Sequence, residues 1–265
     1  MLISLEIWLN LLQLNDMDLN TLVDFLNTTF QVNKIQDFPN AFNGLQLENE
    51  GRISKIVGAV DANRSSIEAA IQQGADLLFV HHGLYWDGVQ PIIGPVWELY
   101  REAMQANLAI YSLHLPLDVH PLYSHNREIA RALDLSIDGS FAHFMNQSCG
   151  LICQNNSKKS LQDSLEKIFP KSLHKLCFGG VPQRVGIVSG SGGQELLKEM
   201  LKANIDTLIT GEVRYAAVSF AQLHKLNIYA CGHYATECFG VKSVLNLLHQ
   251  HTGLPCEFID TFCEL

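Results

Sequence analysis

Short apolar runs alternate with amphipathic stretches along much of the chain. Ile56-Val57-Gly58-Ala59-Val60-Asp61 and Leu77-Leu78-Phe79-Val80 have the continuous apolar character of buried strands. Between them, the spacing of Ile67, Ala70 and Ile71 predicts a helix from Ser65 to Gln73, with Gly74 as its stop. This strand, helix and strand predict a βαβ unit with parallel strands that are covered on both faces.

The same pattern returns in the second half of the chain. A strand from Val185 to Gly190, a helix from Glu195 to Lys202 and a strand from Asp206 to Thr210 repeat the first unit at an offset of 130 residues, the separation of Asp76 and Asp206. Each half then continues with a helix and a third strand, Leu108 to Ser112 or Leu226 to Ala230. The alternative is chance, because βαβ units resemble one another.

A His-x3-acid element follows the third strand in both halves, as His114 to Asp118 and as His233 to Glu237. This shared element argues against chance similarity. We therefore expect two related three-layer α/β domains with mixed or parallel sheets, over residues 17–140 and 141–265, with the boundary in residues 125–150 and a metal site in the crevice between them.

The first sixteen residues are expected to be an extension that the fold does not require. They are apolar, but no basic residue precedes Lys34 and Glu6 interrupts the run, so a signal peptide is not expected. A helix with Asp18 or Asn20 as its cap is predicted next, because Leu19, Leu22, Val23 and Leu26 then share one face. No stretch reaches the roughly 18 uninterrupted apolar residues of a membrane span.

Composition narrows the class of protein further. The chain has 265 residues, of which 47% are hydrophobic and 17% charged, as in globular proteins. A net charge of -9 disfavours non-specific nucleic-acid binding, which needs a cationic face. The seven cysteines lack the spacing of zinc fingers, so reduced thiols in a cytoplasmic protein are expected.

Imidazole and carboxylate groups follow the predicted strands. His81 and His82 come directly after an apolar strand, and a turn at Gly83 would let both side chains reach one crevice. The alternative is an ordinary pair of histidines, one buried and one exposed. His233 and Glu237 face the same way if the chain is helical from Tyr234 onward, and they form either a chelate or a surface hydrogen-bonded pair.

Together with Asp118, these residues make five candidate ligands, which exceed the four of a structural zinc site. They suit two divalent ions, with Glu237 as the predicted bridge and with zinc, iron, manganese or cobalt each chemically allowed. His114 and Glu212 are candidates for a supporting or proton-shuttling role, and His125 is expected to lie on the surface or behind the ligands.

Two further motifs leave alternatives open. Ser189-Gly190-Ser191-Gly192-Gly193 could hold a phosphate through its backbone amides, or it could be an ordinary tight turn. Glu212 and Arg214 could line the same crevice as the candidate ligands, or they could belong to a salt-bridged loop.

Five segments of this chain, in this order, resemble motifs of the GTP cyclohydrolase 1 type 2 homolog family, which are NIF3-like proteins with a dinuclear metal centre. The similarity runs from about Met17 to the C-terminus, and the chain resembles the short form of the family. The segments are Phe42-Asn43-Gly44-Leu45-Gln46, Val80-His81-His82-Gly83-Leu84-Tyr85-Trp86, Leu113-His114-Leu115-Pro116-Leu117-Asp118, Thr210-Gly211-Glu212-Val213-Arg214-Tyr215 and Gly232-His233-Tyr234-Ala235-Thr236-Glu237.

The resemblance implies two α/β domains, a ring-shaped homohexamer and a two-metal site in an inner cavity. It places the family's ligands on the same five positions that the residues themselves suggest. It also implies a metal-dependent hydrolase with a nucleotide such as GTP as substrate. A phosphoesterase or peptidase, or a metal-binding ring without catalysis, are the alternatives, and a nucleic-acid-binding ring is disfavoured by the charge.

Overall fold

The computed structural model describes residues 17–157, 159–193 and 195–262, which form two compact units. Unit 1 contains residues 17–34, 38–114 and 244–261, and unit 2 contains residues 35–37, 115–243 and 262. The predicted extension, residues 1–16, lies outside the described residues. Among the residues described, no helix is long and apolar enough to cross a bilayer.

Unit 1 is built on a five-stranded sheet in the order β13-β4-β5-β6-β2. The strands are β2 (Gly44–Leu47), β4 (Ile56–Asp61), β5 (Leu77–His82), β6 (Ala109–Ser112) and β13 (Cys256–Phe258). All neighbours pair in parallel except β2, which is antiparallel to β6. β1 (Met17–Asp18) and β3 (Arg52–Ile53) form a separate two-stranded antiparallel sheet.

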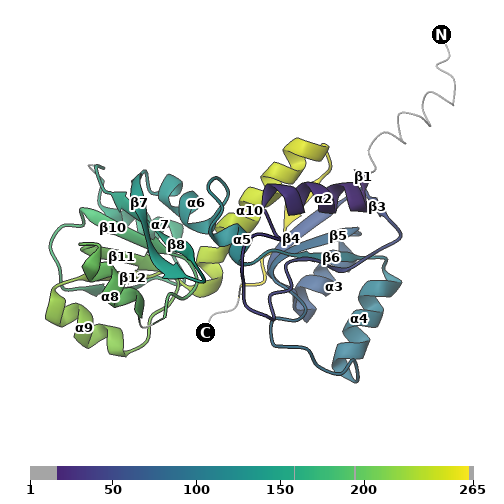
Figure 1. The fold of residues 1–265 in the computed structure, drawn as a ribbon, viewed down its shortest axis with the longest axis horizontal. Coiled ribbons are helices and arrows are strands. Elements are labelled where there is room, and N and C mark those ends of the chain that lie inside the picture. The colour runs from purple at the N-terminus through teal and green to yellow at the C-terminus, as the bar shows by residue number, and fades with distance from the viewer. Residues whose placement is uncertain (1–16, 158, 194, 263–265) are drawn as a thin grey trace, which may run out of the picture. The chain divides into compact units, whose positions relative to one another are not determined.

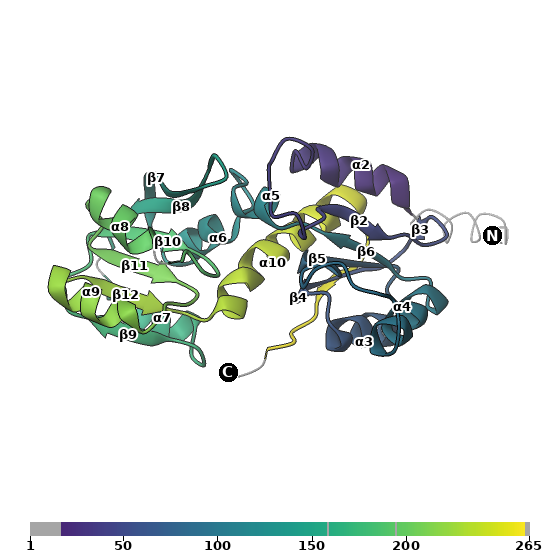
Figure 2. The ribbon, with the colours of Figure 1, turned by 60° about the horizontal axis from the view of Figure 1, so that its bottom comes forward.

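Helices cover both faces of this sheet (Figures 1 and 2). The alternate residues Val57, Leu78 and Ile110 pack with α3 (Arg64–Gln72) and α4 (Pro95–Gln105) on one face. On the other face, the Tyr111 hydroxyl donates to the Asn27 side chain of α2 (Leu19–Thr29), at 2.8 Å. Asp18 caps α2 as predicted, since its carboxylate accepts from the backbone amide of Thr21.

Unit 2 contains a six-stranded mixed sheet in the order β7-β8-β10-β11-β12-β9. The strands are β7 (Ser136–Phe144), β8 (Gln147–Gln154), β9 (His174–Cys177), β10 (Arg184–Val188), β11 (Thr207–Thr210) and β12 (Asn227–Ala230). The three central strands β10, β11 and β12 are parallel, and β8 and β9 flank them in the antiparallel sense.

Residue alternation again divides the core of unit 2 into two layers. Ile187, Ile209 and Tyr229 pack with α6 (His125–Ala132) and α7 (Leu161–Ile168). Their neighbours Leu208 and Ile228 pack with α8 (Glu195–Lys202) and α9 (Ala216–His224) on the opposite face. The remaining helices are α5 (Leu115–Asp118) and α10 (His233–Thr252), and α10 continues along the chain from unit 2 into unit 1.

The predicted repeat is confirmed in both fold and detail. Each unit contains a strand, helix, strand, helix and strand in this order, and its three strands are parallel to one another. The mixed α/β class is the one that the sequence predicts. Asp76 accepts from the backbone amides of Ser54 and Lys55, just before β4. In the same way Asp206 accepts from those of Gln183 and Arg184 where β10 begins.

The division of the chain differs from the predicted one at residues 140 and 141. The N-terminal part of unit 1 ends at His114, and residues 244–261 also belong to unit 1 because β13 pairs with β4. The hairpin β7–β8 joins unit 2 because β8 pairs with β10. Both pairings join segments that are distant in sequence, and neither β13 nor β7 has an apolar pattern strong enough to predict its partner.

Candidate metal centre

The two adjacent histidines lie at the carboxyl end of β5 in unit 1. The strand includes both of them, so it extends two residues beyond the predicted end at Val80. The imidazole rings are nevertheless only 4.6 Å apart between centroids. His81 is fully buried, and its Nδ1 lies 2.9 Å from the carbonyl oxygen of Leu113. Because a carbonyl only accepts, Nδ1 carries the hydrogen and Nε2 has the lone pair that a metal requires.

His82 is fixed by a carboxylate. Its Nδ1 lies 2.8 Å from Oδ1 of Asp61, the residue directly beside it in the parallel register of β4 and β5. A carboxylate that accepts from one imidazole nitrogen orients the ring and makes its other nitrogen a stronger donor to a metal. Asp61 was not among the predicted site residues. Its position at the end of the strand neighbouring β5 is the signal that could have identified it.

His114 joins the two histidines of β5. Its ring centroid is 4.9 Å from that of His81 and 5.6 Å from that of His82. The three residues each offer a ring nitrogen, and these atoms lie within 4.8 Å of one another. The pattern of residues predicts a supporting role for His114, whereas in unit 1 it has the position of a candidate ligand.

The segment Phe42-Asn43-Gly44-Leu45-Gln46 holds the loops beside these histidines. The Asn43 side chain accepts from the backbone amide of His114 at 2.6 Å. The Gln46 amide group donates to the carbonyl of Phe42 and accepts from the amide of Leu84, just after the histidine pair. A Cβ at position 83 would lie 2.2 Å from Gln46 Nε2, so a larger residue there would displace the Gln46 side chain. The segment therefore fixes the path of the backbone around the site.

An aromatic side chain covers the histidines of unit 1. The Trp86 ring stacks on His82 with 4.4 Å between centroids and 28° between planes, and it lies 4.5 Å from His114. Phe38 packs against the edge of Trp86. Such a cover limits access of water to the imidazoles and strengthens electrostatic interactions beneath it.

In unit 2, His233 and Glu237 face each other as predicted. Helix α10 begins at His233, and the positive φ of 92° at Gly232 turns the chain from β12 into the helix. His233 Nε2 lies 3.0 Å from Glu237 Oε1, and its Nδ1 lies 3.4 Å from Glu212 Oε1. The imidazole thus lies between two carboxylates.

This arrangement raises the pKa values of the imidazole of His233 and the carboxyl group of Asp118. The Glu237 hydrogen bond and charge, together with Glu212, raise the pKa of His233 to about 9. Burial raises the pKa of Asp118 well above its usual value, and the charges of Glu237 and Asp37 add to that effect. Carboxylates gathered in a buried place repel one another, and a divalent cation removes that repulsion. The donor set therefore fits a divalent metal.

A buried histidine lies beside Asp118. It ends the short helix α5, in which Pro116 occupies the first turn, where proline needs no backbone hydrogen. His125 Nε2 lies 3.7 Å from Asp118 Oδ1, and its Nδ1 accepts from the amide of Gly240 at 2.9 Å. Since Nδ1 accepts, a neutral His125 carries its hydrogen on Nε2, facing the carboxylate. His125 thus lies behind Asp118, in agreement with one of its two predicted placements.

Glycines bring the strand ends of unit 2 close together. A Cβ on Gly190 would lie 2.3 Å from Glu237 Oε1, and one on Gly211 would lie 2.3 Å from the Gly190 carbonyl oxygen. The Gly190 amide donates to the Thr236 hydroxyl, and the Ser189 amide donates to the Asn126 side chain. Two amides of the glycine-rich loop are therefore already used, which favours the turn over the phosphate cradle at that end of the loop.

The sequence analysis missed Asp61, which contacts the candidate ligand His82, and Gly240, which donates to His125. Glu212, predicted as a supporting residue, does contact a candidate ligand through His233. Within unit 1 the structure brings together His81, His82 and His114. Within unit 2 it brings together His233, Glu237 and Glu212, with Asp118 near enough for Glu237 to change its pKa.

Comparison with known proteins gives consistent results over almost the entire described chain. The model of the Duf34/NIF3 (NGG1p interacting factor 3) family matches residues 17–262. A "GTP cyclohydrolase 1 type 2 homolog" of Deinococcus radiodurans is 36% identical, covering 86% of this chain and 88% of that protein. One of Archaeoglobus fulgidus is 34% identical, covering 92% and 98%.

Solved structures agree with this relationship. The structure described as "protein ybgI, unknown function" has a TM-score of 0.85 and 29% identity, covering 94% of this chain and all of that one. A protein from Thermus thermophilus has a TM-score of 0.78 and 29% identity, with the same coverage. With a family model that spans the described residues and relatives above 30% identity, this chain belongs to the Duf34/NIF3 family.

Proposed function

We propose that this protein binds two divalent metal ions and catalyses a metal-dependent hydrolysis. The observation that carries the proposal is the preset donor geometry of the histidine pair. His81 and His82 each commit Nδ1 to an oxygen, of Leu113 and Asp61 respectively, which leaves Nε2 as the donor in both rings. Metal-ligating histidines almost always donate their second ring nitrogen to such an oxygen, and here two adjacent histidines both do so.

The proposed ligands are His81, His82, Asp118, His233 and Glu237, with Glu237 as the bridge, and His114 is now added as a candidate. When bound, the ions would lower the pKa of a water molecule enough for hydrolysis at neutral pH. The proposed ligands come from both units.

The chain also offers groups that can hold and move protons. Glu212 is exposed and lies 3.4 Å from His233, so it can take a proton that leaves the imidazole when a metal binds. Trp86 would restrict water around His82 and His114. The curated relatives are named as homologs of a GTP cyclohydrolase, so GTP is the first substrate to test. We further propose a homohexamer, on the resemblance alone.

Metal content and turnover test the proposal separately. Purified protein would be loaded with zinc, iron, manganese or cobalt in turn, and metal per chain would be measured by elemental analysis. Changing Glu237 to Ala, or to Gln to preserve its volume, is expected to reduce the metal content by roughly half or more, because a bridging carboxylate contacts both ions. The exposed Glu48 provides the matched control, and Glu48→Ala should retain the parent content.

Turnover would then be followed with GTP by its purine absorbance, and with a panel of phosphoesters and peptides by product analysis. Hydrolysis of any of them that disappears in Glu237→Gln supports the hydrolase. Metal binding without turnover on the entire panel would instead favour a metal-binding ring without catalysis. Unchanged metal content in both Glu237 variants would contradict the bridge.

A further inference from the structure

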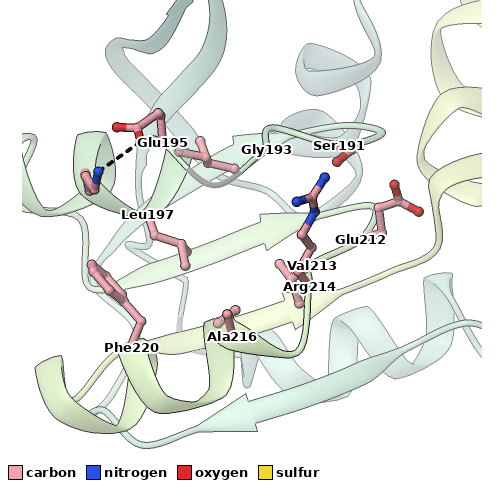
Figure 3. Close-up of a pocket in the computed structure, with 12 residues that line it drawn as sticks. Ser191, Gly193, Glu195, Leu197, Glu212, Val213, Arg214, Ala216 and Phe220 are labelled. Atoms are coloured by element: carbon pink, nitrogen blue, oxygen red, sulfur yellow. Dashed lines mark hydrogen bonds and ion pairs between the residues drawn. The ribbon is translucent and has the colours of Figure 1, made fainter.

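Unit 2 contains a cavity that the candidate ligands do not fill. It has a volume of about 520 Å³ and lies between α8, α9 and the loops that follow β10 and β11 (Figure 3). This volume is within the range of small-molecule sites in proteins. Its lining residues are Ser191, Gly193, Glu195, Leu196, Leu197, Lys198, Glu212, Val213, Arg214, Ala216, Ala217 and Phe220.

The cavity has an apolar part and a cationic part. Leu197, Ala217 and Phe220 provide apolar surface from the two helices. Arg214 makes no hydrogen bond or ion pair with any residue that the structure describes, so its five N–H donors are available. Lys198, in contrast, is paired with Glu195 at 2.9 Å.

The position of Arg214 separates a charged side of the cavity from an apolar side. Figure 3 shows its side chain extending from the loop after β11 toward Ser191, with Glu212 on one side and Leu197 and Phe220 on the other. Glu212 lines the cavity and also contacts His233. The part of the cavity that contains Arg214 and Glu212 is therefore the part that reaches the candidate ligands of unit 2.

We propose that this cavity binds a small organic anion. Its apolar body, a ring or branched chain, occupies the space between Leu197 and Phe220, and its phosphate or carboxylate pairs with Arg214. A guanidinium presents a planar pair of donors that matches either anion. An anion also offsets the free positive charge of Arg214, whereas a neutral ligand would leave it unpaired.

The orientation of the ligand narrows the substrate class of the proposed hydrolase. This step rests on the proposed metal centre. If the metal centre is as proposed, a ligand bound in this way holds its charged end at Arg214, in the part of the cavity where Glu212 contacts His233. The substrate class that fits is then a molecule that reacts at its anionic end. For a phosphomonoester, water would add its oxygen to phosphorus while the bond from phosphorus to the ester oxygen breaks, which gives inorganic phosphate and an alcohol.

Binding can be measured without metal. Phenyl phosphate and benzoate would be titrated into the full chain in the presence of EDTA, and the exchange-averaged ligand signals followed by NMR. Both probes are expected to bind, while phenol and inorganic phosphate, each of which lacks one half of the ligand, should bind at least about 10-fold more weakly. Arg214→Gln is expected to weaken phenyl phosphate by about 10-fold or more.

Matched variants make the result specific to the cavity. Ala216 is an exposed lining residue, so Ala216→Trp should block binding without disturbing the core. Lys202 is an exposed cation of α8 outside the lining, and Lys202→Gln should leave the affinity unchanged. Equal affinity in the parent, Arg214→Gln and Ala216→Trp proteins would overturn the proposal, as would the absence of binding at millimolar probe.

The orientation has its own readout. In protein loaded with paramagnetic manganese, the phosphorus signal of phenyl phosphate should broaden more than its ring protons. The reverse order would overturn the orientation and leave the cavity as a binding site. Failure to bind manganese would count against the metal centre only, because the EDTA titrations do not depend on it.

Discussion

The two units use one scaffold for different chemistry. Both have three parallel strands joined by helices, and both use an aspartate before the second strand to bind the amides where the first strand begins. At the carboxyl ends of those strands, unit 1 has Asp61, His81 and His82, whereas the equivalent positions of unit 2 have Gly190, Gly211 and Glu212.

This difference shows how two copies of one fold can carry different chemical groups at the same edge of the sheet. In unit 1 the strand ends themselves bear the imidazoles, so those positions need large side chains. In unit 2 two of these three positions are glycines, and the start of α10 packs against them with His233 and Glu237. The same edge of the sheet therefore bears candidate ligands in one unit and supports candidate ligands in the other.

The largest expected effect comes from adding a side chain where unit 2 has none. Gly211→Ala places a Cβ 2.3 Å from the Gly190 carbonyl and 2.8 Å from the His233 Cα, and backbone atoms cannot move away easily. We expect a loss of about 3 kcal/mol in the free energy of unfolding, measured in urea. At Gly180 no atom lies within 4 Å of an added Cβ, so Gly180→Ala should change little. Equal stabilities would show that the strand ends of unit 2 are not tightly packed.

A smaller effect is expected from the orienting carboxylate of unit 1. Asp61→Ala removes the partner of His82 Nδ1 and should lower metal affinity by about 10- to 100-fold, measured by competition with a chelator. Asp87 is exposed and close in sequence to the histidine pair, so Asp87→Ala is the control for a general change of charge. Matching affinities in the two variants would mean that Asp61 has no part in holding His82.

The repeated aspartates test whether the two scaffolds are equivalent. Asp76→Ala and Asp206→Ala each remove the acceptor of at least two backbone amides, so each should cost about 1–3 kcal/mol. Amide hydrogen exchange would report which unit loses protection. We expect β4 to respond to the first variant and β10 to the second. A loss of protection in the wrong unit would contradict the assigned equivalence.

The smallest effect is a pH dependence of the metal-free protein. The pKa of His233 is raised from 6.5 in the unfolded chain to about 9, so its stabilising contribution is complete below pH 6.5 and declines as pH rises through 9. His233→Gln should flatten the stability curve in that window, as measured by urea unfolding at several pH values. An identical pH dependence in parent and variant would contradict the raised pKa.

The sequence predicted what depends on local pattern. Apolar runs located the six central strands, and the i, i+4 spacing of His233 and Glu237 predicted the correct face-to-face pair. Local pattern could not give Asp61 or His125 its partner, since those contacts depend on strand register and on a helix more than 100 residues away. Local pattern likewise could not predict that the ring of His114, for which a supporting role was predicted, lies close to that of His81.

The late return of β13 to unit 1 has a consequence for synthesis of the protein. The edge of β4 remains without its parallel neighbour until residues 256–258 have left the ribosome, whereas the continuous segment of unit 2 ends at Ser243. The sheet of the unit that begins first in the chain is therefore the last sheet to be completed. Until then its bare strand edge is a place where nascent chains can associate wrongly, and a chaperone would have most to protect there.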